Sequence, residues 1–90
     1  MPEVSWFFGI VIAMFYREDE PAHFHAILAE HRATIQIESG DIAGKLPKRA
    51  LNLVLEWHNL HQEELRENWW RARNGQQLSK IPPLEQTNGL

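Results

Sequence analysis

A run of nine residues without a charged or amide side chain, Phe8 to Tyr16, is the feature that most constrains the fold of this chain. Its sequence, FGIVIAMFY, is rich in β-branched and aromatic residues, and the lack of polar alternation indicates a strand that is buried on both faces. The run is far shorter than the roughly 20 apolar residues that span a bilayer, and Glu3 precedes it where a signal peptide carries Lys or Arg. We therefore expect a central β-strand in a cytoplasmic protein that does not enter a membrane.

A β-hairpin is expected after this strand. Residues 17–21 interrupt the apolar run with charged side chains and a proline, which cannot donate to a sheet. Residues 23–29 and 33–38 then have the pattern of two short strands joined at residues 30–32. Residues 42–46 would form a further edge strand or an irregular connection.

The alternation of side chains along these strands predicts a register. Pairing His23 with Glu38, and Tyr16 with His23, gives one apolar face and one face that mixes histidine with apolar groups. The apolar face would carry Val11, Ala13, Phe15, Phe24, Ala26, Leu28, Ala33, Ile35 and Ile37. The histidine face would carry Ile10, Ile12, Met14, Tyr16, His23, His25 and Gln36. Large exposed apolar patches are uncommon on monomers, so we expect a helix, a second copy or another protein to cover the histidine face.

The second half of the chain has a helical pattern. Pro47 suits the start of a helix, and Asn74-Gly75 suits its end. Between them an apolar stripe recurs every three or four residues: Ala50, Val54, Trp57, His61, Leu65, Trp69 and Ala72. We therefore expect an α+β fold, with an antiparallel three- to four-stranded sheet followed by one long or two shorter α-helices that break near residues 59–62. Residues 1–81 would form a single domain, and residues 82–90 a frayed tail.

Two histidines, His23 and His25, form the sharpest chemical feature of the sequence. Residues two apart on a strand project from one face roughly 6–7 Å apart, a separation that one metal ion with bonds near 2 Å bridges. The chain has no cysteine, so a divalent transition metal would take its third ligand from a carboxylate, either Asp19 or Glu38. The residues alone favour the alternative, in which both histidines are ordinary sheet residues hydrogen-bonded to Gln36 and Glu38.

Tryptophan and basic residues mark the helical half. Trp69 and Trp70 lie about 100° apart on a helix, so one ring is expected in the core and the other at an edge or interface. His61 falls on the apolar stripe and is expected in the core, whereas His58 is expected in solvent. The basic residues here are Lys45, Lys48, Arg49, Arg66, Arg71 and Arg73. They alternate with glutamates and the net charge is −3, so a solvated helix with ion pairs is favoured over a nucleic-acid surface.

Several motifs resemble those of a known family. They are Met1 to Ser5, Phe8 to Ile12, Pro21 to Ala26, Leu46-Pro47, Val54 to Trp57, Glu64-Leu65, Asn68-Trp69 and Ile81 to Leu84. Over almost its whole length the chain resembles the small bacterial family catalogued as domain of unknown function 4160. The resemblance implies a stand-alone bacterial protein that is often encoded beside another small protein, an arrangement that has prompted toxin–antitoxin proposals.

The resemblance implies no particular reaction. Family members often carry a further histidine just before the prolines, and here Asp19 occupies that place, while Ala22 stands where a second proline is usual. This departure disfavours a three-histidine metal site and keeps a carboxylate ligand available. The recurrence of His23 and His25 as a family motif favours a functional or interface role for the pair.

Three functions stay open from the sequence. The first, which is favoured, is an interaction module that docks a small protein or a second copy. Its candidate interface residues are His23, His25, Tyr16, Gln36, Trp69 and Trp70. The second is a metal-dependent hydrolase or nuclease that uses the two histidines and a carboxylate, and the third is an RNA-binding regulator. The sequence has no glycine-rich phosphate loop, nucleophile elbow or His-Glu-x-x-His helix, so an enzyme is not the favoured interpretation.

Overall fold

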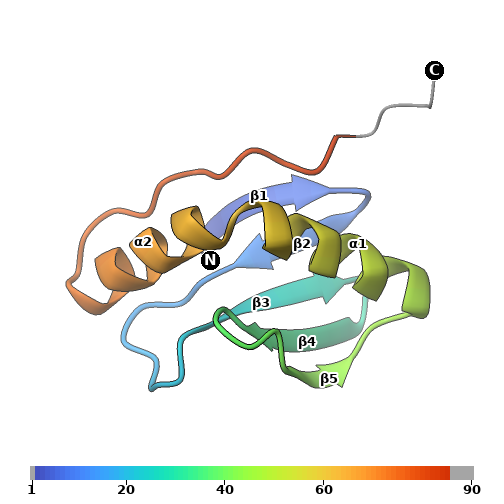
Figure 1. Ribbon diagram of the computed structural model, residues 1–90, viewed down its shortest axis with the longest axis horizontal. Helices are drawn as coiled ribbons and strands as arrows, with labels where there is room; N and C mark the ends of the chain where they lie inside the picture. Colours follow the sequence, from blue (N-terminus) through green and yellow to red (C-terminus); the bar gives the residue numbers. More distant parts are fainter. Residues whose placement is uncertain (1, 86–90) are drawn as a thin grey trace.

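Over the described residues, a five-stranded antiparallel sheet carries two helices on one of its faces (Figure 1). The computed structural model describes residues 2–85. Its elements are β1 (Glu3–Phe7), β2 (Ile10–Ala13), β3 (His23–Leu28), β4 (His31–Gln36), β5 (Ile42–Lys45), α1 (Lys48–Leu60) and α2 (Gln62–Arg73). The strands lie side by side in the order of the chain. The α+β class is confirmed, and so is the two-helix alternative, since the chain breaks at His61.

The sheet has five strands, and the expected number of three to four is wrong. The apolar run contains a turn at Phe8 and Gly9, both of which have positive φ, so β1 folds back on β2. This turn carries no polar residue that would have marked it, and only Gly9 is a residue that favours positive φ. At the other edge of the sheet, residues 42–45 form the regular strand β5.

The hairpin register is shifted by two residues from the predicted one. His23 pairs with Gln36 rather than with Glu38, because the turn consists of Ala29 and Glu30 alone. A shift of two residues leaves every side chain on its original face, so His23 and the next-but-one residue His25 still point to the same side.

The side chains of β2 face the opposite way from the prediction. Ile12 pairs with Ala26, one residue away from the predicted alignment, and a slip of one residue exchanges the two faces of a strand. Ile10, Ile12 and Met14 are therefore fully buried beneath the helices. Val11 lies on the histidine face.

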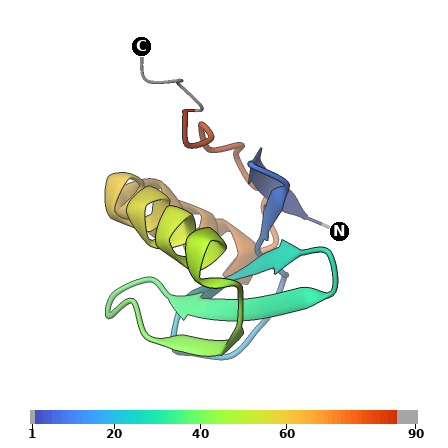
Figure 2. The same cartoon turned by 90° about the vertical axis from the view of Figure 1, so that its right-hand side faces the viewer.

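Trp57 of α1 lies at the centre of the core. Its ring is fully buried and packs against Phe7 at 5.5 Å and Phe24 at 5.7 Å between ring centroids. Its Nε1–H donates to the carbonyl oxygen of Pro82 at 2.9 Å. Figure 2 shows the two helices on one side of the sheet and the C-terminal segment running past β1. Within residues 2–85, no helix lies over the opposite face, the open face of the sheet (Figure 2).

The two helical histidines differ from their predicted environments. His58 is buried rather than solvated, and its Nε2–H donates to the Ile37 carbonyl at 2.7 Å. The loop after β4 folds against α1, and Gly40 lies next to the His58 ring, which explains this burial. His61 is only partly buried and contacts the Glu64 carboxylate at 2.7 Å. Neither helix within residues 2–85 is long and apolar enough to cross a membrane.

The described part of the C-terminal segment packs against the domain. The Ile81 N–H donates to the Val4 carbonyl at 2.8 Å, and Leu84 is buried. Residues 86–90, the rest of the tail that the sequence predicts to be frayed, lie outside the described residues. The domain limit at residue 81 stays a prediction.

We expect Trp57→Ala to lower the free energy of unfolding by about 3–5 kcal/mol, because it removes a fully buried indole and the partner of the Pro82 carbonyl. The matched control is Trp70→Ala, in which the indole is 54% exposed, and which should change stability by about 0.5 kcal/mol at most. Urea unfolding followed by circular dichroism measures both. Equal losses in the two variants would contradict the assignment of Trp57 as the core residue.

Candidate metal centre

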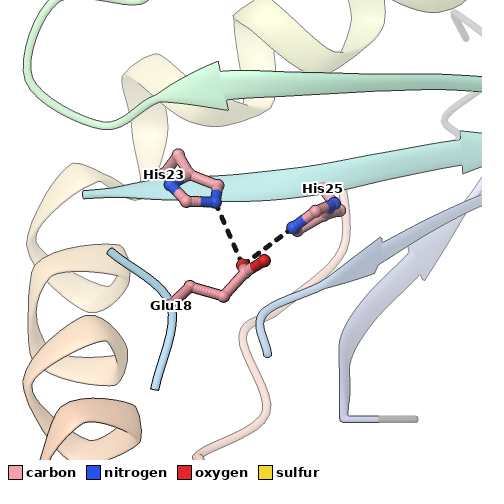
Figure 3. A group of neighbouring side chains, drawn as sticks. All are labelled: Glu18, His23 and His25. Atoms are coloured by element: carbon pink, nitrogen blue, oxygen red, sulfur yellow. Dashed lines mark hydrogen bonds and ion pairs between the residues drawn. The ribbon is translucent and has the colours of Figure 1, made fainter. Parts of the chain in front are cut away.

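His23 and His25 project from the open face of the sheet, and a loop brings a carboxylate to them. Glu18, in the segment between β2 and β3, points its carboxylate at both imidazole rings (Figure 3). Its Oε1 lies 3.0 Å from His23 Nε2 and 2.9 Å from His25 Nε2. The three ligand atoms lie within 4.8 Å of one another, and within residues 2–85 this is the only such group of histidine and carboxylate side chains.

The hydrogen bond on the far side of the His23 ring fixes its tautomer. His23 Nδ1 lies 2.8 Å from the Pro21 carbonyl oxygen, and because a carbonyl only accepts, Nδ1 must carry a hydrogen. In the neutral ring the Nε2 lone pair is then directed at Glu18. The Nε2 lone pair and the Glu18 carboxylate are both hydrogen-bond acceptors. Either a proton on Nε2 or a metal ion must therefore lie between them. A histidine held through Nδ1–H by a backbone carbonyl is the usual state of an Nε2 metal ligand.

The distances suit a four-coordinate divalent ion. With metal bonds of roughly 2.0–2.1 Å, tetrahedral ligand atoms lie roughly 3.3 Å apart, so small side-chain rotations close the cluster around an ion. The side chains of His23, His25 and Glu18 are 18, 24 and 31% exposed. Three protein ligands at this exposure leave a coordination position facing solvent, as catalytic zinc sites do.

Aromatic rings and a second acid support the cluster. The Trp69 ring lies 5.3 Å from the His23 ring, and Phe15 meets the His25 ring edge-on at 4.6 Å between centroids. The Trp69 Nε1–H donates to the Glu20 carboxylate at 3.2 Å, and Arg73 contacts the same carboxylate at 3.3 Å. Helix α2 therefore anchors the loop that carries Glu18, and the rings limit the rotation of both histidines.

Two hollows adjoin the cluster on the open face. One, of about 190 Å³, is lined by Asp19, Glu20, Pro21, His23, Thr34 and Gln36. The other, of about 250 Å³, is lined by His25, Arg32, Ala33, Thr34, Ala43 and Gly44. Thr34 lines both, so the two hollows meet on β4 beside the histidines. The first contains two acids and the second contains a guanidinium, so the cluster lies between surfaces of opposite charge.

The structure separates the predicted site residues into two groups. Gln36 and Asp19 line the first hollow with His23, and Trp69 packs on the His23 ring. Tyr16 is 43% exposed on the surface. The expectation that one of the paired tryptophans is in the core and the other outside is confirmed, since Trp69 is buried and Trp70 is exposed.

Glu38 is held elsewhere. The Arg66 guanidinium donates to its carboxylate from Nε at 2.6 Å and from Nη2 at 3.2 Å. These hydrogen bonds from Arg66 lower the pKa of Glu38 below its ordinary value. The carboxylate is thereby committed to α2, and the two-residue shift of the hairpin places Gln36 opposite His23 in its stead.

Glu18 is the functional candidate that the sequence did not single out. It is the first of three consecutive acids, followed by Asp19 and Glu20, and each of them is close enough along the chain to reach the histidine face. Only the path of the loop distinguishes them. Arg17, directly before Glu18, has a φ of 62°, and this left-handed turn precedes the residue whose carboxylate reaches the rings.

By its fold and site, this is a small α+β protein with a candidate metal centre. Two histidines and one carboxylate form the centre on the open face of the sheet. The chain belongs to the family described as Domain of unknown function (DUF4160), and the family model matches residues 9–70, which include Glu18, His23 and His25. Comparisons with curated proteins and with solved structures give no match.

We expect the metal-stripped protein to bind one Zn²⁺, with Glu18→Gln weakening the affinity by about tenfold or more, because the amide loses the charge of the carboxylate ligand. Glu38→Gln is the matched control and should bind as the wild type does. Competition with a chromophoric chelator measures both affinities. Loss of affinity in Glu38→Gln, with Glu18→Gln unchanged, would move the centre to the other carboxylate.

The Glu38–Arg66 pair gives a separate pH prediction. Because the folded-state pKa of Glu38 is lowered, the stabilisation from this pair is present above the unfolded pKa and is lost as the pH falls through the folded pKa. We expect a carboxyl titration followed by NMR to show a lowered pKa of Glu38 in the wild type and a higher value in Arg66→Gln. An unchanged midpoint would show that the pair is not formed in solution.

Proposed function

We propose that the protein is a hydrolase that depends on a divalent transition metal held by Glu18, His23 and His25. The observation that carries this proposal is the convergence of one carboxylate oxygen and two Nε2 atoms, with the tautomer of His23 set by the Pro21 carbonyl. This ligand set suits zinc or a similar ion, and its exposure leaves room for solvent and substrate. A divalent ion in such a centre supplies Lewis-acid activation of water and of a substrate oxygen.

The residues around the centre have distinct roles in this proposal. Thr34 and Gln36 offer hydrogen-bond partners to a substrate from the floor of the first hollow. Glu20 is occupied by Trp69 and Arg73, so Asp19 is the acid of this hollow that is available to accept a proton from the attacking water. Asp19 thus changes from a candidate ligand to a candidate general base.

Hydrolysis of bis(p-nitrophenyl) phosphate and p-nitrophenyl acetate tests the reaction class. We expect turnover of at least one probe by the Zn²⁺- or Mn²⁺-loaded protein and none by the metal-stripped protein. His23→Ala, His25→Ala should abolish turnover, and Asp19→Asn should lower kcat by about 10²-fold while metal affinity is retained. His31→Ala is the control, since His31 lies outside the cluster. Stoichiometric metal binding without turnover of any ester would contradict the hydrolase.

An interaction module is the second candidate, because large apolar side chains are exposed at several places. Leu60, Trp6 and Trp70 are 64, 59 and 54% exposed. Tryptophan is enriched at protein interfaces, and such surface favours docking of a small protein or a second copy. Light scattering over a range of concentrations would detect a homodimer.

The RNA-binding alternative receives little support. Arg66, Arg71 and Arg73 of α2 each pair with a glutamate: Glu38, Glu67 and Glu20, respectively. Paired guanidinium groups offer less attraction to a phosphate backbone than free ones. The side of α2 that carries these arginines is a solvated surface with ion pairs, as the charge pattern predicts.

A further inference from the structure

Two cations face one another directly on the open face of the sheet. Arg32 of β4 pairs with Lys45 of β5, and both side chains are exposed. Like charges directly opposite on antiparallel strands destabilise the pair. Within residues 2–85 neither side chain forms an ion pair or a hydrogen bond, so no acid of the described chain compensates this repulsion. A negatively charged ligand bound beside Arg32 and Lys45 would compensate it.

The hollow beside this pair is shared with the candidate metal centre. Arg32 and His25 line it together, and no carboxylate is among its lining residues. Its floor is formed by small side chains, and Gly44 lets β5 approach β4 closely, since a Cβ there would lie 2.6 Å from the Arg32 carbonyl oxygen. An anion in this hollow therefore lies between the guanidinium and a metal ligand.

One row of side chains extends from this hollow across all five strands. In register, Trp6 of β1 faces Val11, Val11 faces Ile27, Ile27 faces Arg32, and Arg32 faces Lys45. The row is cationic at the β4–β5 end and apolar from β3 to β1, where the Trp6 ring is 59% exposed. A ligand with an anionic head and an apolar or aromatic body matches this order.

We infer that the substrate of the proposed hydrolase is a phosphate ester. Its phosphate is bound by Arg32 in the hollow beside His25, with Lys45 next to Arg32 on β5, and its organic part lies over Ile27, Val11 and Trp6. This assignment rests on the proposed function and names its substrate class. Two adjacent cations suit a dianionic phosphate better than a singly charged carboxylate, and the planar guanidinium donates to phosphate in a bidentate manner.

Phenyl phosphate is the probe, and calorimetry measures its binding to the metal-loaded protein. We expect Arg32→Gln to weaken binding about tenfold or more, because a charge-assisted bidentate contact is lost. Trp6→Ala should weaken phenyl phosphate but not inorganic phosphate. Arg49→Gln, which changes an exposed arginine of α1 outside this hollow, should bind as the wild type does. Benzoate, the carboxylate analogue, should bind more weakly than phenyl phosphate.

Thermal unfolding without ligand gives an independent readout. Because Arg32→Gln removes the like-charge contact, we expect the Tm of the ligand-free variant to equal or exceed that of the wild type, while added phenyl phosphate raises the Tm of the wild type more than that of the variant. A lower Tm of the ligand-free variant, or equal affinity of Arg32→Gln and wild type, would overturn the inference. So would benzoate binding as tightly as phenyl phosphate.

The same titration separates this inference from the proposed function. If His23→Ala, His25→Ala binds no metal but still binds phenyl phosphate in a manner that depends on Arg32, the anion site is supported. If the wild type binds metal and hydrolyses p-nitrophenyl acetate but does not bind phenyl phosphate, the hydrolase stands and the phosphate assignment fails.

Discussion

The burial of Trp57 against Phe7 and Phe24 commits both helices to one face of the sheet. Side chains alternate along β3, so a strand that turns Phe24 toward Trp57 must turn His23 and His25 to the other face, where Trp69 of α2 still reaches the His23 ring. The same packing that forms the core therefore places the only His-x-His pair of the sequence on the face opposite the core. The position of the candidate centre is a consequence of how the core is built.

The open face is organised by charge as well as by geometry. Asp19 and Glu20 lie on the side of His23, whereas Arg32 and Lys45 lie on the side of His25. With a divalent ion bound, one carboxylate and two neutral imidazoles would leave a net charge of about +1, which would attract an anionic group from the cationic side. In the proposed hydrolase, the acidic side would serve proton transfer. The substrate phosphate and the general base would then occupy different hollows that meet at Thr34.

Much of the architecture follows from local pattern, and the errors have local causes. The helical stripe, the break after α1 and the shared face of the two histidines depend on spacing, which the sequence contains. The β1–β2 turn was missed because it lies inside an apolar run and is marked only by Gly9. The exchanged faces of β2 have a different cause: β2 ends at Ala13 rather than Tyr16, and Ala13 pairs with His25, one residue away from the alignment that the pairing of Tyr16 with His23 gives. The sequence predicts that His23 and His25 share a face, but it does not predict which carboxylate lies beside them, because Glu18, Asp19 and Glu20 differ only in the path of a loop.

The two leading functions compete only where an interface would use the open face of the sheet. A partner that covers the row from Trp6 to Lys45 would also close the hollow beside His25 and the open coordination position of the centre. Catalysis requires that face to be accessible, so a stable complex on it and turnover cannot occur together. The exposed Trp70 lies on α2, and the helices occupy the opposite face of the sheet (Figure 1). An interface built on Trp70 could therefore coexist with an active centre, whereas an interface built on the histidine face would inhibit it.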